Sequence, residues 1–233
     1  MKTLKIFGSI SGMRSQSLFL SAGLLLGVPT MTLQAAEIFS YSVLPGASIQ
    51  FNGSASTFQF NPSTGEQWSI TGDSGGTGSA LNLLGSFSGG PWTYGPITVN
   101  GSVQTATVNP TLAVLTIDDG AGYTATADVT WGVLSTYLGL GAINANVTIN
   151  LSNLSYSGAN VDLLNFFSAP AGELTLNFTF DPAMTLSQLT AGSGPYTTSF
   201  SGSMTSVPEP SVLVIWGLGL VFLVRRSFSG RLS

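Results

Sequence analysis

The charged side chains that could do chemistry in the centre of this chain are all acidic. Two carboxylates suffice for glycoside hydrolysis, and Glu37, Glu66 and Glu173 are candidates, but they are scattered along the sequence. A site without cations also lacks the usual electrostatic stabilisers, so we predict no enzymatic activity and no catalytic residues. No Lys, Arg or His lies between Ala36 and Val207, where the acidic residues are Glu37, Glu66, Asp73, Asp118, Asp119, Asp128, Asp162, Glu173 and Asp181.

A serine nucleophile is a second possibility. The run Gly72-Asp73-Ser74-Gly75-Gly76 looks like the nucleophile loop of chymotrypsin-like serine proteases. That mechanism needs a histidine to accept the serine proton, and the chain has none. Lysine, which can replace histidine as the base, is absent from the same region. We interpret the run as a glycine-rich turn in which Asp73 bonds local backbone groups.

Calcium is the one cofactor that the sequence suggests. Asp118 and Asp119 begin the loop Asp118-Asp119-Gly120-Ala121-Gly122 between two expected strands, and Asp128 follows on the second of them. These carboxylates could gather around Ca²⁺, although their spacing is not that of an EF-hand loop. The alternative is a solvated turn without an ion. Thiolate metal sites and disulfides are excluded, because the chain has no cysteine.

Aromatic side chains could bind a glycan by stacking on sugar rings. Trp92 and Tyr94 lie in a stretch rich in Gly and Pro and are the best candidates for such a platform. The alternative is that they pack within the loop. Trp131 alternates with the apolar positions of its strand, so we expect it in the core.

The elements that must position these residues are β-strands, because the main period between 37 and 207 is two. Alternation is clearest over 123–131, 143–151 and 174–180, which is typical of antiparallel strands with one face in a core. Further strands are expected at 38–43, 47–51, 57–60, 67–70, 97–108, 112–117, 154–157 and 196–204.

Between the strands we expect loops and one short helix. Val161, Leu164 and Phe167 follow Asn160 at helical spacing, with Asn160 as the N-cap. The Gly/Ser-rich segments 72–79 and 85–90 are expected surface loops, and 133–140 fits either a strand or a helix. Together these elements predict an all-β domain over 37–206, a single antiparallel β-sandwich of about ten short strands.

Residues 1–36 have the features of a secretory signal peptide. Lys2, Lys5 and Arg14 form a basic n-region, an apolar run covers 18–28, and Ala35 and Ala36 suit cleavage. An uncleaved membrane anchor is the alternative, but the run is shorter than the roughly 20 residues of a spanning helix. We therefore expect an N-terminal signal helix that is removed on export.

Residues 207–231 form a second targeting segment. Val207-Pro208-Glu209-Pro210 precedes an apolar stretch over 211–224, and a basic tail follows with Arg225, Arg226 and Arg231. The prolines end any strand and favour entry into a helix, so we expect a transmembrane helix at 211–224. The positive-inside rule keeps the cations of both ends in the cytoplasm, which places the cation-free centre outside.

This C-terminal arrangement resembles the PEP-CTERM sorting signal, which exosortases of exopolysaccharide-producing Gram-negative bacteria recognise. The resemblance covers about the last 25 residues and implies an exosortase as partner, with processing near the tripeptide. It implies an inner-membrane-anchored intermediate with its domain in the periplasm, followed by delivery to the cell surface or extracellular matrix. An ordinary single-pass anchor is the alternative. The matching residues are Val207, Pro208, Glu209, Pro210, Arg225 and Arg226.

We therefore predict a non-enzymatic exported protein of the cell surface or the biofilm matrix, with exopolysaccharide as a candidate partner. The alternative function is a glycan-binding or adhesive β-sandwich module that uses the loop aromatics and could depend on calcium. Nucleic acid is excluded as a partner, because neutralising phosphates requires cations that the central region lacks.

Overall fold

The computed structural model describes residues 36–137 and 145–207. The expected signal peptide up to residue 35, the expected transmembrane helix at 211–224, and the sorting residues Pro208, Glu209, Pro210, Arg225 and Arg226 lie outside the described residues. Within the described ranges, no helix is both long enough and apolar enough to cross a membrane.

The described chain is mostly β-structure, as the sequence predicts. Two short helices, α1 (Val161–Phe167) and α2 (Leu186–Ala191), and one 3₁₀ turn, η1 (Gly53–Ala55), interrupt the strands. The strands are β1 (Ile38–Val43), β2 (Ser48–Asn52), β3 (Thr57–Asn61), β4 (Trp68–Ser74), β5 (Leu84–Ser88), β6 (Trp92–Thr93), β7 (Thr98–Asn100), β8 (Val103–Thr107), β9 (Val114–Asp118), β10 (Thr124–Tyr137), β11 (Ala145–Ser155), β12 (Ala171–Phe178), β13 (Tyr196–Thr198) and β14 (Phe200–Val207).

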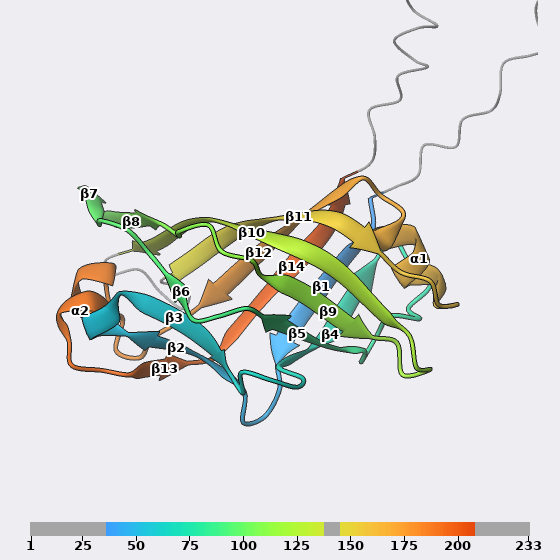
Figure 1. Cartoon of the computed structure of the whole chain (residues 1–233), viewed down its shortest axis with the longest axis horizontal. Coiled ribbons are helices and arrows are strands. Elements are labelled where there is room, and N and C mark those ends of the chain that lie inside the picture. Colours follow the sequence, from blue (N-terminus) through green and yellow to red (C-terminus); the bar gives the residue numbers. More distant parts are fainter. Residues whose placement is uncertain (1–35, 138–144, 208–233) are drawn as a thin grey trace, which may run out of the picture. The chain divides into compact units, whose positions relative to one another are not determined.

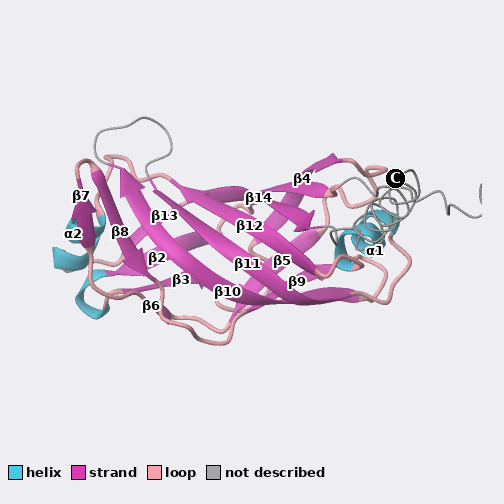
Figure 2. Cartoon of the chain, turned by 90° about the horizontal axis from the view of Figure 1, so that it is seen from above, coloured by secondary structure: helices cyan, strands magenta, loops and turns pink. Residues whose placement is uncertain are grey.

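Two antiparallel sheets make up the fold. The larger sheet has the strand order β11-β12-β14-β1-β4-β5-β9-β10-β8-β7, and a further pairing of β10 with β11 closes it on itself. The smaller sheet has the order β13-β2-β3-β6 and lies along one side of the larger sheet (Figure 1). Helices α1 and α2 lie at opposite ends of the larger sheet, as both views show (Figures 1 and 2).

The closure of the larger sheet is the main departure from the predicted sandwich. β10 has 14 residues, and this length lets it pair with β9 and then β8 along one edge while β11 pairs along the other. Because β10 is hydrogen-bonded along both of its edges, it leaves no open edge, and the larger sheet closes on itself instead of remaining open. The sequence periodicity contains no information on this pairing.

Aromatic rings fill the space between the two sheets. Trp131 of β10 packs against Trp92 of β6 with ring centroids 4.8 Å apart, and edge-on against Phe58 of β3 at 5.2 Å. Phe60 of β3 stacks on Phe87 of β5 at 4.8 Å. Such pairs stabilise a core beyond the area they bury, and the prediction that Trp131 is a core residue is confirmed.

The alternating segments fold largely as expected, with differences at their ends. On β10, Ala125, Ala127 and Val129 are buried, but Tyr123 precedes the strand and is 50% exposed. The ambiguous segment 133–140 is strand up to Tyr137, and its remainder lies outside the described residues. The expected single strands at 97–108 and 196–204 are each two strands, β7 with β8 and β13 with β14.

One expected surface loop is wrong. Residues 85–90 include most of β5, a strand of the larger sheet with Gly85 in its interior. A Cβ atom at Gly85 would collide with the indole ring of Trp68, which is fully buried on the neighbouring strand β4. Glycine is present here because a ring occupies the place of its side chain, and not because the chain turns.

Helix α2 was not predicted, although its start has a sequence signature. Thr185 and Gln188 form a capping box: each side chain bonds the backbone N–H of the other residue. The pattern Thr-x-x-Gln before an apolar residue is typical of a helix N-terminus. The helix is only six residues long, which makes its apolar periodicity too short to detect.

Candidate functional site

Three carboxyl groups meet at the end of the larger sheet where α1 lies. They belong to Glu37, directly before β1, Asp73 on β4 and Asp162 on α1. One oxygen from each lies within 4.8 Å of the others. We call Glu37, Asp73 and Asp162 the acidic cluster.

Helix α1 is confirmed, but its buried face is not the predicted one. Asn160 caps the helix by accepting a hydrogen bond from the Leu163 N–H, as expected. The residues chosen for their helical spacing are mostly outside: Val161 is 49% exposed and Leu164 is 42% exposed. Phe166 and the charged Asp162 are both fully buried instead, so the helix carries a carboxylate into the interior.

Asp162 is held by an unusually complete set of hydrogen bonds. Its Oδ1 accepts from the N–H and the hydroxyl of Thr77 at 2.8 and 3.0 Å. Its Oδ2 accepts from the N–H and the hydroxyl of Ser79 at 2.6 and 2.8 Å, and from the Ala80 N–H at 3.2 Å. Burial favours the neutral acid, but these donors outweigh it and hold the pKa of Asp162 well below its ordinary value.

Asp73 faces the interior because of a β-bulge. β1 and β4 pair Tyr41 with Ile70 and then Ser40 with Gly72, so Thr71 is an extra residue on β4. The shift places Asp73 opposite Phe39, and directly opposed residues of an antiparallel pair project from the same face. Phe39 is fully buried, so the bulge turns Asp73 toward the core end instead of solvent.

Glu37 shares its face with the core residues of β1. Side chains two residues apart on a strand project from the same face, so Glu37 lies on the face of Phe39 and Tyr41. Phe39 and Tyr41 are buried. Glu37 is accordingly only 3% exposed. Its Oε1 atom is buried and has no hydrogen-bond partner, and the same is true of Oδ1 of Asp73. The other oxygen of Asp73, Oδ2, accepts a hydrogen bond from the Gly78 N–H at 3.1 Å.

Negative charge accumulates in the cluster without a cationic side chain to balance it. The described residues contain no Lys, Arg or His. Burial, followed by the neighbouring carboxyls of Asp73 and Asp162, raises the pKa of Glu37 to about 8. Burial and Asp162 also raise the pKa of Asp73. The cluster therefore requires either a bound proton or a bound cation to be stable near neutral pH.

Gly76 lets the chain pass close to all three carboxyl groups. A Cβ atom at this position would collide with Oε1 of Glu37 and Oδ1 of Asp73, and would lie 2.8 Å from Cγ of Asp162. The unpartnered oxygens of Glu37 and Asp73 thus both pack against Gly76, where the side chain of any other residue would collide with them. Residues 74–77 are exposed and Asp73 is half-buried, so this side of the cluster lies nearest to solvent.

The arrangement is chemically suited to an ion and not to a polysaccharide. Carboxylate oxygens are ligands for hard divalent cations. Glycoside hydrolysis needs a carboxyl pair that flanks an accessible sugar bond, whereas Glu37 and Asp162 are 3% and 0% exposed. The other two glutamates considered for that role, Glu66 and Glu173, are exposed on a loop and on β12.

The aspartates predicted to bind calcium are not gathered in the described structure. Asp118 Oδ1 accepts from the Gly120 N–H at 2.8 Å, and Asp119 Oδ1 accepts from the N–H groups of Ala121 and Tyr123 at 2.8 and 3.0 Å. Asp128 Oδ2 accepts from the Asn153 amide at 2.7 Å. These carboxylates stabilise a turn and a strand pair, in line with the solvated-turn alternative. Among the described residues, the one group of three acidic side chains with metal-ligand spacing is the acidic cluster.

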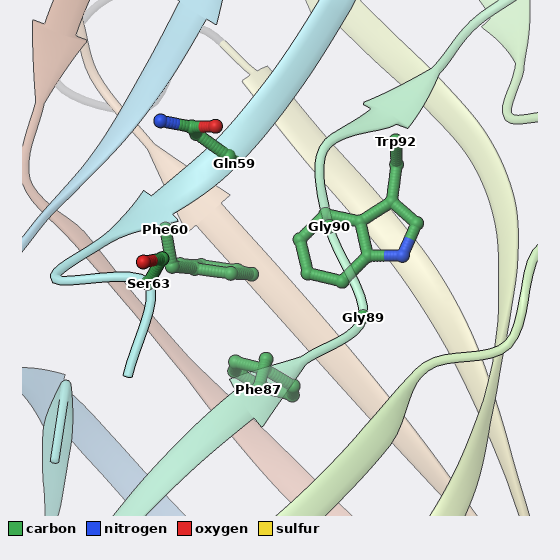
Figure 3. A pocket seen from close by; sticks show the side chains of 7 residues that line it. All are labelled: Gln59, Phe60, Ser63, Phe87, Gly89, Gly90 and Trp92. Atoms are coloured by element: carbon green, nitrogen blue, oxygen red, sulfur yellow. The ribbon is translucent and has the colours of Figure 1, made fainter. Parts of the chain in front are cut away.

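The proposed glycan platform is also not formed. Trp92 is 1% exposed and Tyr94 is 4% exposed, because both rings point into the aromatic core. The hollow beside Trp92 has a cavity volume of about 40 Å³ and is lined by Gln59, Phe60, Ser63, Phe87, Gly89, Gly90 and Trp92 (Figure 3). That volume suits a few water molecules and not a sugar ring.

The acidic cluster was not predicted from the sequence, although one of its three residues has a readable signal of burial. Glu37 falls in register with Phe39 and Tyr41, and this alternation is a readable signal of burial. The inward orientation of Asp73 depends on the bulge at Thr71, which no sequence pattern predicts.

No protein-family model, curated protein or solved structure matches this chain.

Proposed function

We propose that this chain is a non-enzymatic, β-sandwich-like surface or matrix domain, exported through its N-terminal segment and sorted by an exosortase through its C-terminal Pro-Glu-Pro segment. The proposal joins the targeting features of both ends with a tightly packed centre that has no Lys, Arg or His. Its partners are the exosortase, the inner membrane during sorting, and exopolysaccharide after delivery.

The observation that carries the proposal is the pairing of the domain's two ends. β1 and β14 are neighbours in the larger sheet. The Glu37 N–H donates to Ser206 Oγ at 2.8 Å, and the Ser206 N–H donates to the Glu37 carbonyl at 2.9 Å. Adjacent ends are compatible with a domain whose two flanking segments both enter one membrane, and these ends are directly hydrogen-bonded.

The glycan-binding alternative has less support. It relied on Trp92 and Tyr94, and both rings are buried. Stacking on a sugar requires an exposed ring face. Exopolysaccharide therefore enters the proposal as the surrounding matrix and not as a ligand of these residues.

The test is the fate of the chain in its own host when the tripeptide is removed. Pro208→Ala, Glu209→Ala and Pro210→Ala together should hold the protein in the inner-membrane fraction and abolish its delivery to the surface or the medium. Glu66→Ala is the matched control, since it removes one exposed acid from the folded domain. Delivery of the triple variant at the wild-type level would refute the sorting proposal.

A further inference from the structure

The acidic cluster contains buried oxygens for which the described residues supply no hydrogen-bond donor. Glu37, Asp73 and Asp162 place three carboxyl groups within 4.8 Å of one another. Asp162 is compensated by the N–H and hydroxyl donors of residues 77–80. The buried oxygens Oε1 of Glu37 and Oδ1 of Asp73 have no donor. Unsatisfied buried oxygens are costly, and two of them in one cluster of carboxyl groups favour a positive ligand.

We propose that Glu37, Asp73 and Asp162 bind one Ca²⁺ ion. The proposal goes beyond the proposed function and holds whether or not an exosortase sorts the chain. It assigns calcium to a part of the domain different from the Asp118 loop, because the group of three acidic residues with metal-ligand spacing among the described residues is the acidic cluster.

The donor set selects the kind of ion. It contains carboxylate oxygens and neither nitrogen nor sulfur, because the described chain has no His and no Cys. Such a set favours Ca²⁺, Mg²⁺ or Mn²⁺ over zinc and copper. Ca²⁺ accepts irregular arrangements of oxygen ligands completed by water, whereas Mg²⁺ demands a nearly ideal octahedron. Ligands from three unrelated segments, of which only Asp162 is fixed by many hydrogen bonds, fit the more tolerant ion.

The location gives the ion a structural role. Phe39 of β1 stacks on Phe166 of α1 with ring centroids 5.1 Å apart. Phe39 follows Glu37 by two residues, and Phe166 follows Asp162 by four residues. The ion would join the first residues of the domain to the end of β4 and to α1. Binding would therefore stabilise the end of the domain at which β1 begins and β14 finishes.

Calcium titration of the purified full chain in detergent tests the proposal. After treatment with EDTA, we expect binding of one Ca²⁺ per chain by calorimetry, with Kd of order 10⁻⁴–10⁻³ M, as in extracellular modules. At tenfold excess over Kd, the Tm should rise by roughly 3–6 °C. MgCl₂ at the same concentration should raise it less, and NaCl of matched ionic strength should not raise it.

Two isosteric variants locate the site. Glu37→Gln and Asp73→Asn each remove one charge while keeping the side-chain shape, and each should weaken calcium binding at least tenfold and remove the Tm shift. Glu66→Gln, an exposed acid away from the cluster, should bind as the wild type does. Asp73→Asn keeps an oxygen for the Gly78 N–H, so it should fold even if Glu37→Gln does not.

Several results would overturn the assignment. These are a wild-type Tm that is the same in EDTA and in calcium, an equal shift with MgCl₂ or NaCl, and binding that survives Asp73→Asn but is lost in Asp118→Asn. None of these results bears on sorting, which the tripeptide variant tests separately.

Discussion

The Trp68 indole lies where the side chain of residue 85 would be, so Gly85 and Trp68 form one packing unit across β4 and β5. The ring is fully buried and tilts against Tyr41 at a centroid distance of 5.0 Å and against Phe87 at 5.8 Å. Because the Trp68 ring lies over the paired position of β5, that position has no room for a side chain. This relationship explains why a glycine-rich stretch is a strand.

Gly85→Ala should destabilise the domain by about 1–3 kcal/mol, because the added methyl overlaps the Trp68 ring and forces it to move. Urea unfolding followed by tryptophan fluorescence measures the change. Gly95→Ala is the matched control: its Cβ would lie at an ordinary 3.6 Å from the Thr107 carbonyl oxygen. Equal stability of the two variants would contradict the packing account.

Asp162→Asn in EDTA should lower the free energy of unfolding by roughly 3 kcal/mol, because an amide cannot accept all the donors that the carboxylate now satisfies. Removing one negative charge from the cluster raises the free energy of unfolding, but it relieves only part of the repulsion between the carboxyl groups. Asp118→Asn, which alters one exposed turn bond, should change stability by less than about 0.5 kcal/mol. If Asp162→Asn had the same free energy of unfolding as the wild type, the loop at 77–80 would not depend on this carboxylate.

The stability of the metal-free protein should fall as pH rises from about 4.5 to about 8. The pKa of Glu37 is raised to about 8 in the folded chain from 4.5, so in this window the folded state keeps a proton that the unfolded state has lost. The contribution is complete below pH 4.5 and is lost as pH rises through 8. Urea midpoints measured in EDTA across this range should decline for wild type and decline less for Glu37→Gln. A wild-type midpoint that rises over the window would contradict this assignment.

The fold could be predicted from sequence only as far as local periodicity reaches. Alternation over 143–151 and 174–180 predicted β11 and β12, and the Asn160 cap predicted α1. The closure of the larger sheet depends on pairing between β10 and β11, and Gly85 depends on a ring from another strand. Both are long-range packing relationships, which a local pattern does not contain.

The candidate site was harder to predict than the fold. Calcium was assigned to Asp118, Asp119 and Asp128, which lie within eleven residues of one another in sequence, but these carboxylates accept local hydrogen bonds in the fold. The acidic cluster joins residues 37, 73 and 162, which only the folded sheet brings together. Trp92 and Tyr94 were expected at the surface because Gly and Pro surround them, but their large apolar rings are buried in the core.

A disulfide between engineered cysteines should covalently crosslink the two ends of the domain. Ile38 and Thr205 are opposed in the β1–β14 register, a geometry within the reach of a disulfide. In this cysteine-free chain, Ile38→Cys with Thr205→Cys should crosslink under oxidation and add about 2–4 kcal/mol of stability. The pair Ile38→Cys with Ser203→Cys, which is out of register, should crosslink poorly. Equal crosslinking of the two pairs would contradict the pairing on which the proposed function depends.

The most direct test of the export and sorting proposal is the intact mass of the protein recovered from its own host. The proposal predicts a species that begins near Ala36 and ends near Pro208, so that both flanking segments have been removed. A recovered chain that still carries Arg231 would show that the C-terminal segment is a permanent anchor, and it would contradict the proposal.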